Sequence, residues 1–149
     1  MPVIQVDNRE KTPLVFQSLR TETASLYTGD YSIKGLEGFA IERKTISDLA
    51  SSVSSGRERF AREMERLKGM NFARLLIIGS IQDIEQQQYR AGIQPKAVLN
   101  TLSSWEIKYS VPVVFASTPE QGAILIEQWA YYYARNIAKQ AYNLARFTD

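Results

Sequence analysis

The sequence contains no histidine and no cysteine. The absence of cysteine excludes disulfides, zinc–cysteine sites and thiol nucleophiles, and the absence of histidine removes imidazole as a base, proton shuttle or metal ligand. Serine–histidine triads, zinc hydrolases and histidine-dependent nucleases are therefore excluded in their usual forms. Any chemistry must use carboxylates, Lys, Arg, Tyr, Ser or Thr, a set that suits a hard, oxygen-preferring ion such as Mg²⁺.

Long apolar runs and a strong net charge are also missing. No run approaches the roughly 18 apolar residues that a membrane span requires, and the opening MPVIQVDNRE has neither a basic lead nor a signal-peptide core. We therefore expect a cytoplasmic protein with no membrane partner. The net charge is only +2, so any contact with nucleic acid must come from a local patch.

The chain has 149 residues, of which 44% are hydrophobic, and this length favours a single domain over 1–149. Strands are expected over 2–7, 25–33 with an interruption at Gly29, 38–44, 73–79 and 111–116. Helices are expected from Thr45, over 57–68, from Pro95, and from 119 to about 146, where a break could divide the last one. Residues 12–24 are expected to form a loop with a short helical piece at 16–19. This order predicts an α/β fold in which a mixed β-sheet is flanked by helices.

The stretch that carries chemistry begins at Asp30 and ends with Glu42, Arg43 and Lys44. Side chains alternate along a strand, so Glu42 and Lys44 are expected on one face and Arg43 on the other. Asp30 on the preceding strand of a hairpin, and Asp7 at the end of the first strand, could lie beside them.

Three converging carboxylates would repel one another unless a cation neutralised them. Mg²⁺ held by a few carboxylates while keeping several waters is the expected solution. The metal would polarise a phosphate oxygen and lower the pKa of a bound water. Lys44 could then orient or deprotonate that water, or stabilise the charge that develops on the phosphate.

Each of these residues also has a plain structural interpretation. Asp7 could be an ordinary turn residue after a strand, and Glu10 a surface acid. Asp30 could belong to a β-bulge. Asp48 has the spacing of a helix-capping partner of Thr45, an explanation that carries the same weight as a functional one.

Three ordered blocks resemble the nuclease signature of the XPF-type structure-specific endonucleases. The pattern GD, eleven residues, ERK, three residues and D covers 29–48, the strand end VDNRE covers 6–10, and SSVSSGRERF covers 51–60. Members of that family commonly carry tandem helix-hairpin-helix modules after the nuclease domain. This chain has no room for them, so we expect a stand-alone nuclease domain of prokaryotic or viral origin.

The resemblance implies a restriction-endonuclease-like fold and Mg²⁺- or Mn²⁺-dependent hydrolysis of DNA phosphodiester bonds, with branched or flap-like DNA as the substrate. It assigns catalytic roles to Asp30, Glu42, Arg43 and Lys44. It assigns metal ligation to Asp7, Asp30 and Glu42. Supporting motif positions are Arg9, Glu10, Asp48 and Arg57.

The last helix and the helix after the motif raise the question of partners. The last helix is rich in aromatic residues, namely Trp129, Tyr131, Tyr132, Tyr133, Tyr142 and Phe147. A core role together with a homodimer interface is favoured over stacking on unpaired bases, and the resemblance also implies a homodimer. Arg59, Arg62 and Arg66 could follow phosphates, although interspersed acids favour a solvated face.

Two other functions compete with a metal-dependent endonuclease. The first is a catalytically silent subunit that binds DNA or acts as a scaffold for a partner nuclease, but such subunits tend to lose motif acids that this chain keeps. The second is a related nuclease with another task, such as a junction resolvase or an exonuclease, because one fold hosts many functions.

Overall fold

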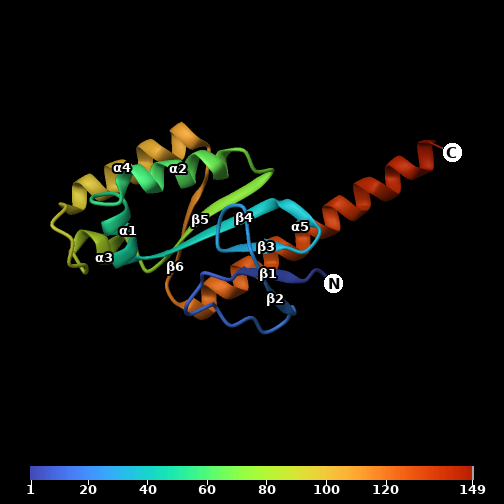
Figure 1. Cartoon of the computed structure of the whole chain (residues 1–149), viewed down its shortest axis with the longest axis horizontal. Coiled ribbons are helices and arrows are strands. Elements are labelled where there is room, and N and C mark those ends of the chain that lie inside the picture. Colours follow the sequence, from blue (N-terminus) through green and yellow to red (C-terminus); the bar gives the residue numbers. More distant parts are fainter. Residues whose placement is uncertain (149) are drawn as a thin grey trace.

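The computed structural model describes residues 1–148 and shows one mixed six-stranded sheet with helices on both faces (Figure 1). The strands are β1 (Ile4–Asp7), β2 (Thr21–Ala24), β3 (Tyr31–Ile33), β4 (Leu36–Thr45), β5 (Phe72–Ile78) and β6 (Val113–Ala116). The helices are α1 (Ile46–Ser52), α2 (Arg57–Lys68), α3 (Ile81–Glu85), α4 (Pro95–Tyr109) and α5 (Pro119–Thr148). The expected α/β class, with a mixed sheet flanked by helices, is confirmed.

The order of strands across the sheet is β2-β1-β3-β4-β5-β6. β1, β3 and β4 are antiparallel neighbours, whereas β4, β5 and β6 run parallel to one another. In register, Val6 of β1 lies opposite Tyr31 of β3, and Tyr31 lies opposite Ile41 of β4. The ends of β1 and β3 and the middle of β4 therefore meet, and this meeting point holds the motif acids.

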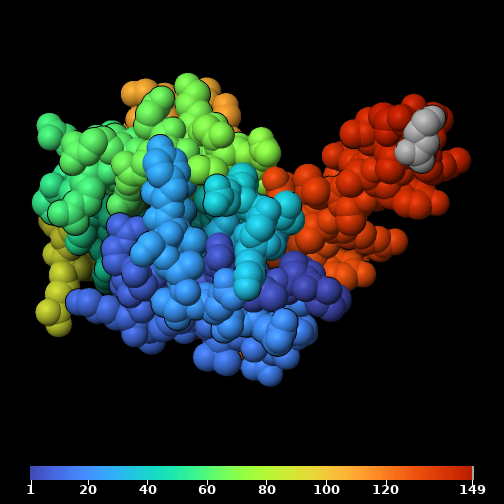
Figure 2. Space-filling model, turned by 45° about the vertical axis from the view of Figure 1, so that its right-hand side comes forward, coloured from blue at the N-terminus to red at the C-terminus, as the bar shows by residue number. Residues whose placement is uncertain are grey.

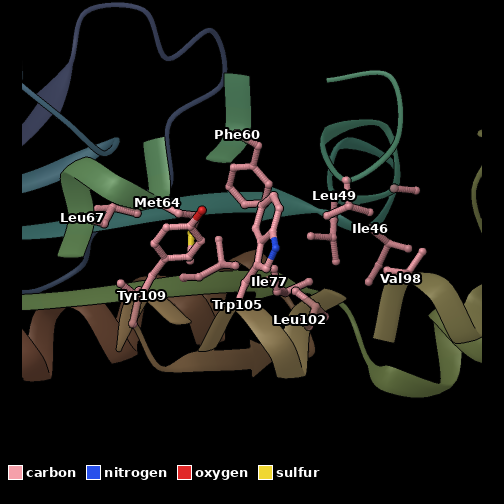
Figure 3. Packing of buried hydrophobic residues seen from close by; sticks show 14 of the residues in the cluster. Ile46, Leu49, Phe60, Met64, Leu67, Ile77, Val98, Leu102, Trp105 and Tyr109 are labelled. Atoms are coloured by element: carbon pink, nitrogen blue, oxygen red, sulfur yellow. The ribbon is translucent and has the colours of Figure 1, made fainter. Parts of the chain in front are cut away.

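One face of the sheet is covered by α1, α2, α3 and α4, whose apolar side chains form the core drawn in Figure 3. Phe60 and Met64 of α2 are buried, as the i, i+4 pattern predicts. The Phe60 ring packs 5.6 Å from that of Trp105 on α4, measured between centroids. These contacts hold α2 against the sheet and determine which side of the helix lies next to β4, the strand that carries the motif.

The other face is covered by α5 and by the segment that follows β1. Leu76 of β5 joins this second core, whereas its neighbours Leu75 and Ile77 join the first. A strand buried on both faces reads as a continuous apolar run, which explains the LLII sequence of β5.

The region before the motif differs from the expectation. β2 was expected to be loop, but it pairs in parallel with β1 at the sheet edge. No helix forms at 16–19, where the backbone N–H groups of Ser18 and Leu19 both donate to Glu127 Oε2 at 2.7 Å. These hydrogen bonds to α5 replace the local bonds that a helical turn would need.

Three further element boundaries differ. The strand expected over 25–33 is confined to β3, because Gly29, with a φ of +78°, interrupts the extended backbone just before it. The short helix α3 was not predicted, although Ser80 and Asp83 form a capping box at its start. The last helix runs unbroken from Pro119 to Thr148. Within residues 1–148, none of these helices is both long enough and apolar enough to span a membrane.

Candidate active site

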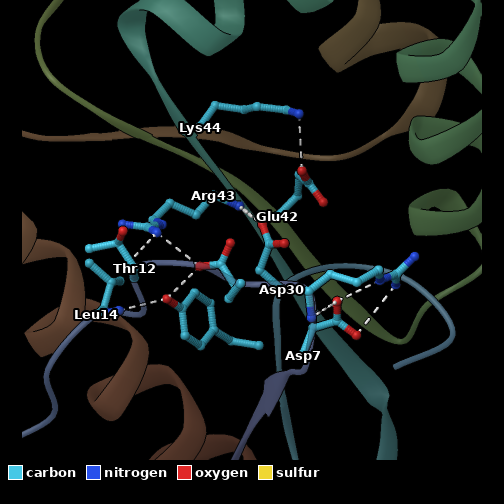
Figure 4. A network of polar contacts seen from close by, with 10 residues as sticks. Asp7, Thr12, Leu14, Asp30, Glu42, Arg43 and Lys44 are labelled. Atoms are coloured by element: carbon cyan, nitrogen blue, oxygen red, sulfur yellow. Dashed lines mark hydrogen bonds and ion pairs between the residues drawn. The ribbon is translucent and has the colours of Figure 1, made fainter. Parts of the chain in front are cut away.

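A polar cleft of about 250 Å³ opens where β1, β3, β4 and α2 meet. Its walls are formed by Asp7, Arg9, Tyr27, Thr28, Gly29, Asp30, Glu42, Lys44, Glu63 and Arg66. All of the acids and the lysine that the motif singled out as ligands or catalytic groups, namely Asp7, Asp30, Glu42 and Lys44, lie in this one cleft (Figure 4).

Gly29 allows the chain to place Asp30 against β4. Its φ is +78°, in the left-handed region that favours glycine, and an added Cβ would lie 3.0 Å from the carbonyl oxygen of Ile41. The Asp30 N–H donates to that same oxygen at 2.7 Å, and Asp30 Oδ2 accepts from the Arg43 N–H at 2.8 Å. The Gly-Asp pair thus fixes the carboxylate beside β4 through the backbone, while the register shift between β3 and β4 lies after Asp30, between Tyr31 and Ile33.

Glu42 and Lys44 share one face of β4, as the alternation predicts. Lys44 Nζ lies 3.3 Å from Glu42 Oε2, 3.9 Å from Glu63 Oε2 and 4.9 Å from the centroid of the Phe60 ring. Burial alone would lower the pKa of Lys44, but the charges of Glu42 and Glu63 outweigh it and raise this pKa. Lys44 is therefore an ammonium held between two acids.

Two acids of the cleft, Asp30 and Glu42, interact unfavourably when both are ionised. Burial raises the pKa of Asp30 to about 7, and the charge of Glu10 adds to the rise. Burial also raises the pKa of Glu42 to about 8, with the charge of Asp30 as the next cause. Neighbouring carboxyls show this behaviour when no cation neutralises them.

Asp7 lies on the same wall but has partners of its own. Arg9 Nε donates to Asp7 Oδ2 at 2.7 Å, and the Leu26 N–H donates to Asp7 Oδ1 at 3.0 Å. Burial would raise the pKa of Asp7, but the hydrogen bonds from Arg9 and Leu26 outweigh it and lower this pKa. Asp7 is thus ionised and already neutralised.

The expected convergence of three carboxylates is therefore reduced to a pair. No group of three acids within residues 1–148 is arranged to hold a metal together. Asp30 and Glu42 remain, and Mg²⁺ is commonly bound through one or two carboxylates with waters and substrate phosphates completing its shell. Glu63 adds negative charge beside this pair, because its buried oxygen Oε2 accepts no hydrogen bond. The donors are all oxygens and carry excess negative charge, so the residues present fit a hard divalent cation.

Arg43 does not line the cleft, although the motif placed it among the catalytic residues. Its guanidinium points to the opposite side of β4, where Nη2 donates to Glu10 Oε2 at 2.9 Å and to the Thr12 carbonyl at 2.7 Å. The Tyr31 hydroxyl donates to the same oxygen of Glu10 and accepts from the Leu14 N–H (Figure 4). Arg43 and Glu10 hold the segment after β1, and their influence on the cleft is indirect.

Two other motif residues lie outside the cleft. Thr45 caps α1, and its side chain accepts from the Asp48 N–H at 3.1 Å. Asp48 itself is exposed, which favours the capping interpretation. Arg57 donates to the Val53 carbonyl and to Thr101 Oγ1, and its guanidinium lies 4.9 Å from the Trp105 ring centroid, so it joins α2 to α4.

Glu63 and Arg66 reach the cleft from α2. Sequence reasoning named Arg66 only as one of three arginines that could follow phosphates, and it gave Glu63 no role in the site. Glu63 precedes the buried Met64 and Arg66 precedes the buried Leu67. Polar residues that border an apolar stripe lie at the edge of a packed helix, where side chains can reach a neighbouring strand. The place of Glu63 and Arg66 beside the apolar stripe was the sequence signal that could have found them. This signal does not tell which edge of α2 faces β4.

Comparisons with known proteins agree with the fold. The ERCC4 domain matches residues 6–128. XPF from Aeropyrum pernix superposes with a TM-score of 0.73 at 23% identity over 89% of this chain, and the complex of XPF from the same organism with DNA superposes with a TM-score of 0.72 at 23% identity over 91%. The alignments cover 61% and 66% of the lengths of those two chains. A search of curated protein sequences found no match. Because the ERCC4 match spans most of the chain, and this match and the fold agree, the protein belongs to the ERCC4 domain family.

Proposed function

We propose that this protein is a divalent-metal-dependent DNA endonuclease that hydrolyses phosphodiester bonds at branched or flap-like DNA. The observation that carries the proposal is the placement of Asp30, Glu42 and Lys44 together in one polar cleft. Membership of the ERCC4 domain family supports a nuclease. The DNA complex of the A. pernix XPF supports DNA as the ligand class.

Asp30 and Glu42 are the residues that would hold Mg²⁺ or Mn²⁺. When bound, the ion supplies positive charge and Lewis-acid activation of the phosphodiester and of the attacking water. The raised pKa values of both carboxyls show that the folded chain disfavours their charged forms, and a bound cation removes that cost. Asp7 can contribute as a third ligand when Arg9 releases its carboxylate for a phosphate.

Lys44 acts on the substrate side of the site. Its raised pKa keeps the ammonium charged, so it is suited to orienting a water and to stabilising negative charge that grows on the phosphate. Proton abstraction by Lys44 would first require loss of its two carboxylate neighbours. Arg9 and Arg66 at the cleft wall add positive charge where a phosphate approaches.

The decisive experiment is a panel of labelled flap, fork, nicked, junction and linear DNAs incubated with Mg²⁺, Mn²⁺ or a chelator. We expect cleavage of at least one branched DNA with either metal and none in the chelator. Glu42→Gln is the matched control, because it keeps the side-chain volume and removes the ligand charge. Cleavage that persists in the chelator would refute the metal mechanism. No cleavage of any DNA, together with DNA binding, would favour the silent scaffold.

We also propose that the protein is a homodimer formed through the apolar face of the outer half of α5. Ala130 is buried on the side of α5 that faces the sheet, and Ile137, Ala141 and Leu144 continue this side beyond it at helical spacing. Leu144 is 65% exposed in the monomer. Light scattering at micromolar concentration should give twice the chain mass, and Leu144→Glu should give a monomer. Ile107→Glu on α4 is the control, since Ile107 is also exposed but lies on another helix.

A further inference from the structure

The net positive charge of the protein comes from one segment. Residues 1–127 contain 15 basic and 15 acidic residues, so the sheet and its covering helices are neutral overall. Residues 128–148 contain Arg135, Lys139 and Arg146 and no acidic residue. The outer part of α5 therefore supplies the whole excess of basic residues.

This segment projects from the body of the molecule. The red end of α5 extends beyond the sheet in Figure 1 and stands clear of the rest of the chain in Figure 2. All residues from 138 to 148 are exposed. Since they pack on nothing else within residues 1–148, neither burial nor the core accounts for their composition.

The three cations share one face of the helix. Spacings of four and seven residues place Arg135, Lys139 and Arg146 within a narrow stripe. Tyr132 and Tyr142 fall on the same stripe and are 61% and 67% exposed. We call these five residues the basic arm. Favourable interaction with the helix dipole accounts for Arg146 in the last turn, but not for Arg135 and Lys139, which lie several turns earlier.

The basic arm begins at a hollow in the surface. A cavity of about 620 Å³ lies at its base, with aromatic walls from Phe72, Trp129 and Tyr133 and polar walls that include Arg135 and Lys139. Trp129 and Tyr133 are anchored against Phe72, with ring centroids 6.0 Å and 5.9 Å away. The aromatic residues of α5 thus form two sets, one packed on the sheet and one exposed among cations.

We propose that the basic arm binds the phosphate backbone of DNA and holds a part of the substrate that lies outside the cleft. Closely spaced cations without intervening acids match a polyanion, and exposed tyrosines between them can contact sugars or stack on unpaired bases. From Arg135 to Arg146 the helix rises about 16 Å, the length of roughly five nucleotides of one strand. A second copy of the chain is a poorer occupant, because two such faces would repel each other. The inference rests on the proposed DNA substrate.

The test is equilibrium DNA binding in a chelator, measured by the fluorescence anisotropy of a labelled duplex and a labelled single strand across a salt series. The triple variant Arg135→Gln, Lys139→Gln and Arg146→Gln should bind at least about tenfold more weakly at low salt. The slope of log affinity against log salt should fall by about two to three units, close to one for each lost phosphate contact. The double variant Tyr132→Ala and Tyr142→Ala should reduce affinity for the single strand more than for the duplex.

The matched control removes the same charge elsewhere. Arg90, Lys96 and Lys108 are exposed, and their triple glutamine variant should keep the wild-type salt slope and lose less than about threefold in affinity. Equal losses in both triple variants, or wild-type affinity and slope in the arm variant, would overturn the proposal. Loss of binding to anionic vesicles with unchanged DNA binding would overturn it in favour of a membrane surface.

Two further measurements separate this inference from the proposals above. Light scattering of the arm variant should give the wild-type mass. A halved mass would mean that the weaker DNA binding came from a change in oligomeric state, and it would overturn the inference. Binding is measured without metal and is independent of cleavage. A wild-type protein that binds DNA through the arm but cuts none would refute the endonuclease activity alone.

Discussion

Arg43 and Lys44 are consecutive residues of β4, yet their side chains enter two networks of opposite character. On one side of the strand, Arg43 donates to Glu10 and to the Thr12 carbonyl, and Tyr31 completes the shell of Glu10. Each of these charged groups has its hydrogen-bond partners within the chain. Such a closed network holds the segment after β1 in place, because its charged groups are paired with one another.

On the other side, the network around Lys44 is open. Its ammonium lies between Glu42 and Glu63, and Glu63 Oε2 is buried without a hydrogen bond. Burial and mutual repulsion raise the pKa of Asp30 and of Glu42. The difference teaches that one strand can carry a closed network on one face and an open one on the other, and that unsatisfied acids mark the open face, where we propose the chemistry.

The largest expected effect comes from the open side. Lys44→Ala and Glu42→Gln should each lower the cleavage rate by about 10²-fold or more, because they remove charge stabilisation and a metal ligand. Neither variant should unfold the protein, and Glu42→Gln should keep or raise the melting temperature without metal. Cleavage assays and thermal denaturation check both statements. A Lys44→Ala variant that cuts at the wild-type rate would show that the site is assigned wrongly.

The closed side should respond in stability first. Arg43→Ala leaves Glu10 without its cation and should lower the free energy of unfolding by about 3 kcal/mol. The double variant with Glu10→Gln should recover part of this loss, because the unpaired charge is then removed. Chemical denaturation of the wild type, the single variants and the double variant measures these free energies of unfolding. If Arg43→Ala keeps full stability and still abolishes cleavage, Arg43 reaches the substrate and the contrast between the two faces fails.

The open network should also make the stability of the protein depend on pH. The pKa of Asp30 is raised to about 7 and that of Glu42 to about 8 in the folded chain, so between about pH 4 and pH 8 the unfolded state releases protons more readily. In a chelator, the stability should therefore fall as the pH rises through this window. Thermal denaturation from pH 5 to pH 9 measures the slope. The double variant Asp30→Asn and Glu42→Gln should flatten it, and an equal slope in that variant would place its origin elsewhere.

A smaller effect is expected for Glu63, which holds Lys44 from α2. Glu63→Gln should lower the cleavage rate by about tenfold, the range of a lost charge-assisted contact, while metal affinity is kept. The pH profile of the rate should also shift, because the charge of Glu63 raises the pKa of Lys44. Glu65→Gln is the control, since Glu65 is exposed on the same helix. Loss of metal binding in Glu63→Gln would make Glu63 a ligand instead.

The smallest effect is expected for Asp48. Asp48→Ala should change the free energy of unfolding by a few tenths of a kcal/mol, because only its charge near the start of α1 is lost. Thr45→Ala should cost about 1 kcal/mol, since the Thr45 side chain caps the helix. Both variants should keep most of the wild-type cleavage rate. A strong loss of cleavage in Asp48→Ala alone would return this residue to the site.

The sequence by itself determined the features that depend on the order of residues within a single strand or helix. Strand alternation predicts that Glu42 and Lys44 share a face and that Arg43 leaves it, because the side-chain period of a strand is two. The i, i+4, i+7 stripe of α2 and the cap at Thr45 were predictable for the same reason. The motif blocks also placed Asp7 and Asp30 beside this strand.

Only the tertiary structure decided what depends on how elements pack. It placed Glu63 against Lys44, gave Arg9 to Asp7 and left the outer half of α5 in solvent. It also replaced the expected turn at 16–19 by hydrogen bonds to Glu127, which lies more than 100 residues later. Local periodicity states which way a side chain points from its own backbone. Packing decides which partner it meets, because that partner comes from a distant segment whose position only the completed core fixes.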